Sequence, residues 1–232
     1  MAIAYVRKED VALTFKDGYA EAEMLPGSFP HVKCYRCALK AGTTITPPVH
    51  IGAQQYICFT GGEGYVTTPL KAFNIGELSF FVTKLGEAYS VHAATDMEYT
   101  TFVVEMGERE MAQYNKSRLV MPFFRKLSDA DEYWQDCKTE GTRSWQILVG
   151  KHAFPIIMGV VKSPSGGTIE KGHPSVAQWN IILDESDIVL TVEEESVDQT
   201  TGDFSFVPAG PDHSLVAKPG KRLSYIWFEY YV

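Results

Sequence analysis

Short apolar segments, broken at regular intervals by turn residues, run along most of the chain. Between Val32 and Glu105 glycine, proline or asparagine interrupts them roughly every 8 to 12 residues, which is the spacing typical of a β-sandwich or β-barrel. Helical periodicity is essentially absent from this half. We therefore predict strands at 32–40, 54–60, 63–68, 78–83, 88–93 and 98–106.

The same pattern resumes at Ser144 and continues to the end of the chain. Seven further segments have the composition of strands: SWQILVG, FPIIMGVVK, QWNIILD, DIVLTVEE, FSFVPAG, SLVAK and LSYIWFEYYV. The last of these is aromatic at nearly every position, so we expect both of its faces to be covered. One face is expected to pack against the interior of the fold, and the other against either further residues of the chain or a subunit partner.

The segment between the two β-rich halves has a different pattern. Residues 107–145 are rich in charge, and Ser128 could cap a short helix over 129–137, with Asp129, Asp131 and Glu132 in its first turn. We interpret this segment as a connector. The predicted organisation is an N-terminal β domain at 1–118, a connector at 119–143 with a short helix, and a C-terminal β domain at 144–232.

A sequence unit recurs in the two halves. GTTITPPVHIGAQQYICFTGGEG, residues 42–64, contains His50 and Gln54, and GGTIEKGHPSVAQWNIILDE, residues 166–185, contains His173 and Gln178. Side chains at even separation share one face of a strand, so His50 and Gln54 are predicted to point into the same cavity. The repeat indicates two copies of one β module.

Composition and charge restrict the function classes. The chain has 232 residues, 45% of them hydrophobic, with a net charge of -8, which argues against a general nucleic-acid or anionic-membrane surface. Charged residues at 7–10 interrupt any signal peptide, and no apolar run is long enough for a membrane helix. With four cysteines, a reducing cytoplasm is the expected location. Cys34 and Cys37 form a C-x-x-C within a predicted strand, where they face opposite sides, so we expect structural cysteines.

Two spaced motifs resemble those of the cupin family. That family carries a glycine, five residues, His-x-His, three or four residues, Glu, six residues and Gly; then a glycine, five residues, Pro-x-Gly, two residues and His. The second motif is complete in the C-terminal half, with Gly202, Pro208, Gly210 and His213. The chain is thus similar to bicupins over about residues 30–230.

The first motif in the N-terminal half matches the family in spacing and departs from it in chemistry. It runs from Gly42 to Gly61, with Pro48 at the first histidine, His50 at the second and Gln54 at the glutamate. The second motif there is looser. Tyr89 stands where the family has its histidine, with His92 three residues later.

The C-terminal copy of the first motif is partial. Gly167 leads to His173 at the first histidine, Ser175 stands at the second, and Gln178 lies close to the glutamate position. One residue of slippage leaves open whether Gln178 or Trp179 faces inward. His31 and His152 belong to neither motif and are expected to be structural.

The resemblance implies an all-β fold of two tandem cupin barrels, that is, double-stranded β-helix or jelly-roll domains. In metal-bearing members histidines and a carboxylate hold a divalent ion such as Mn, Fe, Ni or Zn. The candidate ligands here are His50, Gln54 and either Tyr89 or His92 in one barrel, and His173, Gln178 and His213 in the other. Tyr56, Tyr89 and Trp179 are candidate pocket residues, with plain core packing as the alternative.

Two functions follow from this resemblance. The first is a metal-dependent bicupin enzyme, of hydrolase, isomerase or dioxygenase type, acting on a small polar metabolite and distantly similar to the ureidoglycine aminohydrolase family. The second is a small-ligand-binding bicupin without catalysis, which the glutamines at carboxylate positions favour. The resemblance also implies a homodimer, and no feature of the sequence indicates a nucleic-acid or membrane partner.

Overall fold

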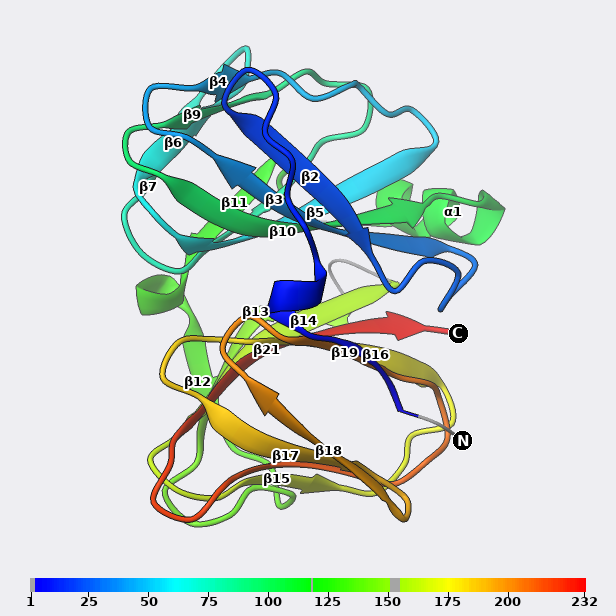
Figure 1. Cartoon of the computed structure of the whole chain (residues 1–232). Coiled ribbons are helices and arrows are strands. Elements are labelled where there is room, and N and C mark those ends of the chain that lie inside the picture. Colours follow the sequence, from blue (N-terminus) through cyan, green and yellow to red (C-terminus); the bar gives the residue numbers. More distant parts are fainter. Residues whose placement is uncertain (1–2, 118, 151–154) are drawn as a thin grey trace. The chain divides into compact units, whose positions relative to one another are not determined.

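The chain folds into two compact β units. The computed structural model describes residues 3–117, 119–150 and 155–232, and His152 lies outside these ranges. One unit, here called the N-terminal barrel, comprises Val11–Asp129. The other, the C-terminal barrel, comprises Met1–Asp10 together with Ala130–Val232. Figure 1 shows the strands of each unit.

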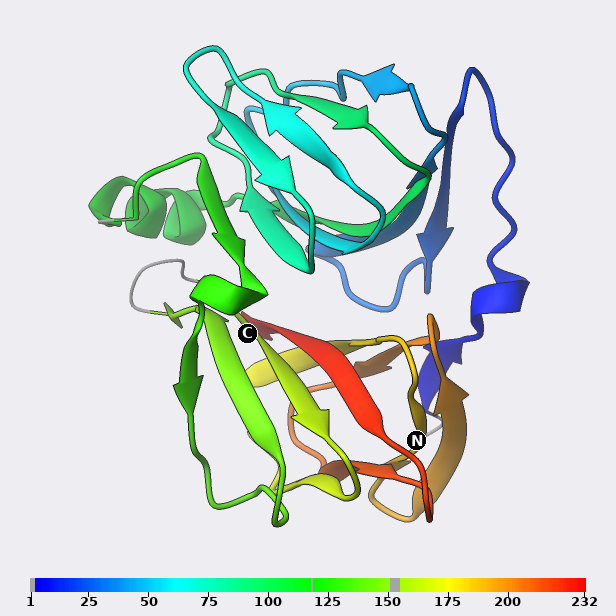
Figure 2. The same cartoon turned by 90° about the vertical axis from the view of Figure 1, so that its left-hand side faces the viewer.

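Two antiparallel sheets form the N-terminal barrel, and Figure 2 shows them around a common interior. The larger has the strand order β11-β8-β5-β10-β3-β2 and the smaller the order β4-β9-β6-β7. The strands are β2 (Tyr19–Met24), β3 (Val32–Leu39), β4 (Thr44–Ile45), β5 (Ala53–Gly61), β6 (Gly64–Thr67), β7 (Ala72–Ile75), β8 (Ser79–Val82), β9 (Ser90–Ala93), β10 (Met97–Glu105) and β11 (Phe123–Lys126).

The C-terminal barrel has the same two-sheet construction. Its sheets have the orders β1-β19-β16-β21-β14-β13-β12 and β15-β20-β17-β18. The strands are β1 (Ala4–Val6), β12 (Asp131–Tyr133), β13 (Arg143–Leu148), β14 (Ile156–Ser163), β15 (Gly167–Glu170), β16 (Val176–Ile182), β17 (Asp187–Val192), β18 (Glu195–Thr200), β19 (Phe204–Val207), β20 (His213–Ala217) and β21 (Leu223–Tyr231). The predicted all-β fold class is confirmed.

The start of the chain contributes a strand to the C-terminal barrel. β1 pairs antiparallel with β19, with Ala4 opposite Phe206, and the short 3-10 helix Lys8–Asp10 follows it. The backbone N–H of Lys8 donates to Asp203 Oδ1 at 2.9 Å. Residues 3–10 therefore belong with the C-terminal barrel, whereas the sequence pattern predicted that all of 1–118 belongs to the N-terminal one.

Alternation along the strands fills each barrel interior. In β5, Ile57 and Phe59 belong to the core cluster of the N-terminal barrel, while in β16 Ile182 belongs to that of the C-terminal barrel. The side chains of the opposite faces are also buried, so β5 and β16 are apolar or neutral throughout. Central strands with both faces covered have this continuous composition.

The four cysteines are free thiols. Cys37 belongs to the core cluster of the N-terminal barrel. Cys34, three residues earlier on β3, is buried on the other face of the strand, as the alternation of a strand requires.

The predicted helix over 129–137 is wrong. This segment contains a 3-10 turn at Leu127–Asp129 and then the strand β12, which pairs with β13. The ladder with β13 supplies the hydrogen bonds that a helix would have made internally, so pairing overrides the local capping signal at Ser128. The α-helix lies earlier, at α1 (Glu108–Lys116). Within the described ranges no helix has the length and apolar character needed to cross a bilayer.

Candidate functional site

The histidines predicted in the C-terminal barrel lie in the loop before β16, for His173, and at the first residue of β20, for His213. Gly172 and Gly210 let the loops before β16 and β20 approach closely, because a Cβ at Gly172 would lie 1.7 Å from the Gly210 carbonyl oxygen. Gly210 also has a φ of +118°, which favours glycine. Its N–H donates to the His173 carbonyl oxygen at 3.2 Å, and Gly172 N–H donates to Asp212 Oδ1 at 2.7 Å. The backbone thus brings His173 next to the start of β20.

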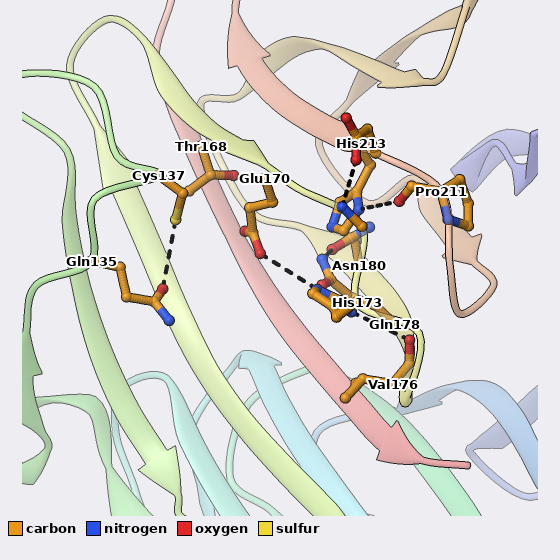
Figure 3. A network of polar contacts seen from close by, with 12 residues as sticks. Gln135, Cys137, Thr168, Glu170, His173, Val176, Gln178, Asn180, Pro211 and His213 are labelled. Atoms are coloured by element: carbon orange, nitrogen blue, oxygen red, sulfur yellow. Dashed lines mark hydrogen bonds and ion pairs between the residues drawn. The ribbon is translucent and has the colours of Figure 1, made fainter.

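His173, His213 and Glu170 converge on one point. The two imidazole rings lie edge to face with centroids 5.2 Å apart, and His173 Nε2 is 3.6 Å from Glu170 Oε2. Glu170 ends β15 directly opposite His213 in the β15–β20 ladder. One donor atom from each of the three side chains lies within 4.8 Å of the others, and Figure 3 shows the three side chains together.

Backbone carbonyls orient both rings. Nδ1 of His173 lies 3.3 Å from Val176 O, and Nδ1 of His213 lies 3.3 Å from Pro211 O. These contacts place the proton on Nδ1 of each neutral ring, so that Nε2 carries the lone pair. The two Nε2 atoms are buried and have no hydrogen-bond partner among the described residues.

This donor set fits a divalent metal ion. Imidazole nitrogens and a carboxylate oxygen bind such ions at about 2.0–2.2 Å, which places neighbouring donors about 3 to 3.5 Å apart. The separation of 3.6 Å between His173 and Glu170 is close to that value. A buried ring nitrogen without a hydrogen bond costs free energy, and a metal ion held between the three side chains would pair both Nε2 atoms.

The environment shifts the protonation of these groups in different directions. The neighbouring Glu170 carboxylate raises the pKa of His173 above its usual value, because it stabilises the imidazolium. Burial lowers the pKa of His213, since the charged ring would lose its hydration. The pocket therefore holds His213 neutral at neutral pH, as metal binding requires.

A further carboxyl group lies near this cluster, on the interior face of the same barrel. Glu229 lies on β21 two residues beyond Trp227, a member of the core cluster, and directly opposite Gln178 on β16. Burial raises the pKa of Glu229 to about 7, with the charge of Glu170 acting in the same sense and that of His173 opposing it.

The structure decides which residue of β16 faces inward. Gln178 and Asn180 share a face with the core residue Ile182, and Gln178 Nε2 donates to Asn180 Oδ1 at 2.8 Å. Gln178 Oε1 is buried and has no hydrogen-bond partner among the described residues. Figure 3 shows both amides beside the histidines. Trp179 lies on the opposite face and packs against Phe206 and Phe228, so it does not face the histidines.

In the N-terminal barrel Gln54, which was predicted to point into the interior, lies on the opposite face of β5. Gln54 Nε2 donates to Thr83 O, and Gln54 Oε1 accepts the hydroxyl of Tyr56, two residues along β5. Both side chains point away from the core cluster. Gln55 faces the interior instead, where its Oε1 accepts the Tyr89 hydroxyl at 2.9 Å. Gln54 and Tyr56 therefore do not face the barrel interior as predicted, and Gln55 faces it instead. Gln55 and Tyr89 both line a cavity inside this barrel.

The two histidines predicted in this barrel do not come together. His92 uses Nδ1 with Thr44 Oγ1 at 2.9 Å and Nε2 with Thr67 Oγ1 at 2.8 Å, and it stacks on Tyr65. Both ring nitrogens are thus occupied, so His92 has no lone pair free for a metal. His50 lines the cavity. Among the described residues, the group formed by Glu170 and the two C-terminal histidines is the one cluster of three ligating side chains.

Comparison with known proteins identifies the architecture. No protein-family model and no curated protein sequence matches the chain. Among solved structures, a variant of oxalate decarboxylase from Bacillus subtilis aligns with 99% of this chain and 79% of its own at 14% identity and a TM-score of 0.75. A glyoxylate-induced protein from Pseudomonas aeruginosa aligns with 98% of this chain and 88% of its own at 15% identity and a TM-score of 0.79.

The chain has the bicupin fold. The tandem jelly-roll barrels predicted from the sequence are therefore confirmed at the level of fold. A further structure of the Bacillus subtilis enzyme, at 14% identity and a TM-score of 0.74, is described as containing Mn(II) centres.

The candidate metal centre contains a residue, Glu170, that was not among the predicted ligands because it lies outside the motifs expected in a bicupin. Glu170 lies three residues before His173, outside the motif position where a carboxylate is expected, and Glu229 comes from the last strand. The signal for Glu170 was the alternation of β15: Thr168 and Glu170 share a face, and Thr168 is buried. Pairing of β15 with β20 then places Glu170 beside His213, which no local spacing indicates.

Proposed function

We propose that this chain is a metal-dependent bicupin enzyme whose C-terminal barrel holds a divalent ion through Glu170, His173 and His213 and acts on a small polar metabolite. The observation that supports this most is the pair of buried Nε2 atoms that have no hydrogen bond among the described residues and converge with the Glu170 carboxylate. Two imidazoles and one carboxylate suit Mn, Fe, Ni or Zn and leave coordination positions for a substrate.

Each side chain of the site has a proposed part in the chemistry. When bound, the metal ion supplies Lewis-acid polarisation of a carbonyl or of water. The Nδ1 contacts to backbone carbonyls hold the rings of His173 and His213 in place. Gln178, whose amide is oriented by Asn180, presents its free Oε1 as a further oxygen donor to the metal or as an acceptor for a substrate N–H or O–H.

Glu229 is the residue proposed to move protons. It lies on β21 opposite Gln178, and it does not belong to the cluster of three donors. A carboxyl group in a partly dehydrated site exchanges a proton near neutral pH, as general acid–base catalysis requires. This arrangement serves hydrolysis, isomerisation and dioxygenation alike, because the fold does not fix the reaction.

Elemental analysis of the purified chain tests the metal centre. We expect about one equivalent of Mn, Fe, Ni or Zn, and we expect His173→Ala, His213→Ala and Glu170→Gln each to lower the affinity by more than about 100-fold, since loss of outer partners alone costs about 10- to 100-fold. His50→Ala is the matched control, because it removes the motif histidine of the other barrel. A metal content that does not depend on these three residues would contradict the proposal.

A small-ligand-binding protein without catalysis is the second candidate. A glutamine faces each barrel interior, Gln55 in one and Gln178 in the other, and amides are weaker metal ligands than carboxylates. A metal-free preparation that still binds small molecules would favour this candidate.

We further propose that the protein works in the cytoplasm as a homodimer. The four free thiols support the location, because they suit a reducing compartment. The proposal of a homodimer rests on the resemblance to bicupins, because Tyr225, Trp227, Phe228 and Tyr230 of the last strand are buried within the chain and do not themselves mark an interface. Sedimentation velocity gives the mass in solution, and a monomer at micromolar concentration would contradict the dimer.

A further inference from the structure

The N-terminal barrel contains a cavity of about 630 Å³ that is separate from the candidate metal centre. All the residues that line it belong to Val11–Asp129. The cavity lies over the interior face of the large sheet. On strand β10 the core residues Met97 and Tyr99 are followed on the same face by Thr101, Val103 and Glu105, which line the cavity. Its volume is in the range of natural small-molecule sites.

The inner part of this cavity is polar but uncharged. Tyr89 donates to Gln55 Oε1, and the thiol of Cys37 lies 3.8 Å from Thr101 Oγ1. Burial raises the pKa of Cys37 to about 12 and the pKa of Tyr89 above its usual value, so both groups stay protonated at neutral pH. The interior therefore offers hydroxyl, thiol and amide groups to a ligand and no buried charge.

Several tyrosines surround this polar interior. Tyr19, Tyr35, Tyr89 and Tyr99 line the cavity, and they come from β2, β3, β10 and the segment before β9. Tyr19 donates to Glu21 Oε2 at 2.5 Å, which ties the hydroxyl of this tyrosine to the acidic edge of β2. Tyrosines supply large flat surfaces for ring-bearing ligands together with a polar end.

The charged residues of the lining are exposed, and their balance disfavours an anion. Glu21 and Glu105 contribute two carboxylates, and Lys33 one ammonium group. A metal ion is also a poor occupant, because the one cluster of three ligating side chains among the described residues lies in the other barrel. His50 is the one imidazole on the cavity wall.

We propose that the N-terminal barrel binds, without metal, an uncharged aromatic molecule that carries hydroxyl or amide groups. The ring lies among the tyrosines, and its polar edge exchanges hydrogen bonds with Gln55 and Thr101. This site is independent of the metal centre, so the chain carries two different small-molecule sites, one in each barrel.

Three probes that differ in charge test the class of ligand. They are 4-hydroxybenzamide, which is neutral, 4-hydroxybenzoate, which is an anion, and 4-hydroxybenzamidine, which is a cation. Binding to the full-length chain is measured by calorimetry and by ligand-observed NMR. We expect the neutral probe to bind at least about tenfold more tightly than the anion, since the anion would lose hydration beside Glu21. Equal or tighter binding of the anion or of the cation, or no binding of the neutral probe, would overturn the proposal.

A pair of isosteric variants locates the site. Thr101→Val removes a hydroxyl from the cavity wall, whereas Thr100→Val makes the same change on the opposite face of β10. We expect Thr101→Val and Gln55→Leu each to weaken binding of 4-hydroxybenzamide about 5- to 10-fold, and Thr100→Val to leave it unchanged. Equal effects of the two threonine variants would place the probe elsewhere and overturn the assignment.

Variants of the candidate metal centre control for binding of the probe in the other barrel. His173→Ala and His213→Ala should leave the affinity for 4-hydroxybenzamide unchanged, because both residues belong to the other barrel. Loss of binding in these variants would show that the probe occupies the metal site instead. A thermal melt of each variant, compared with the parent chain, separates loss of a contact from loss of the fold.

Discussion

His173 and His213 meet edge to face, with ring centroids 5.2 Å apart and both Nε2 atoms buried without a hydrogen-bond partner among the described residues. Plain core histidines would pair both ring nitrogens, as His92 does with Thr44 and Thr67. Each of the two rings instead pairs Nδ1 with a backbone carbonyl and directs Nε2 toward the other members of the cluster, with His173 Nε2 3.6 Å from Glu170 Oε2. The contrast with His92 is the strongest reason to place the chemistry in the C-terminal barrel.

The first prediction concerns the contact between the two loops. Gly172→Ala should abolish tight metal binding, because the new Cβ would lie 1.7 Å from Gly210 O and would force the loops of His173 and His213 apart. Metal titration monitored by calorimetry measures the loss. Gly76→Ala is the matched control, since a Cβ there meets nothing within 4 Å. Unchanged metal affinity in Gly172→Ala would contradict the role of this contact.

The second prediction is that metal binding releases protons near neutral pH. In the metal-free protein the pKa of Glu229 is raised to about 7 and the pKa of His173 is raised by Glu170, so both groups are partly protonated at pH 6.5. A divalent ion favours the proton-free forms of both. Calorimetry in buffers of different ionisation enthalpy should count about one proton released per metal ion, and Glu229→Gln should lower that count. A count of zero would show that these groups do not face the ion.

The third prediction concerns stability of the metal-free protein. Glu229 has a higher pKa in the folded than in the unfolded chain, so the folded state binds its proton more tightly and stability falls as pH rises from about 4.5 through about 7. Glu229→Gln removes this penalty. Denaturant unfolding should therefore show the variant gaining about 1–3 kcal/mol relative to the parent chain between pH 5 and pH 8. A gain independent of pH would assign the effect to packing instead of charge.

Most of the fold could be predicted from the sequence, because it follows from alternation and turn spacing. The six strands predicted between Val32 and Glu105 all occur, within one or two residues of their expected ends. The errors arose where distant pairing decided the outcome. β12 forms because β13 lies beside it, and the first strand joins β19, which is nearly 200 residues away in the chain.

The site was less predictable, because a shift of one residue along a strand reverses the face. In β16 the motif spacing led to Gln178, which does face inward, but in β5 the same spacing led to Gln54, whose neighbour Gln55 occupies the interior. Glu170 enters the candidate metal centre through its pairing with His213, which depends on the ladder between β15 and β20. Local sequence contains no information on that pairing.

The central claim is that a divalent ion binds between Glu170, His173 and His213. Anomalous diffraction at the metal edge, from crystals grown with Mn²⁺ or Zn²⁺, tests it most directly. The account predicts one strong peak in the C-terminal barrel, at about 2.0–2.2 Å from both histidine Nε2 atoms and from a Glu170 oxygen, and no peak in the tyrosine-lined cavity of the N-terminal barrel. An empty C-terminal barrel, or a peak at His50 instead, would contradict it.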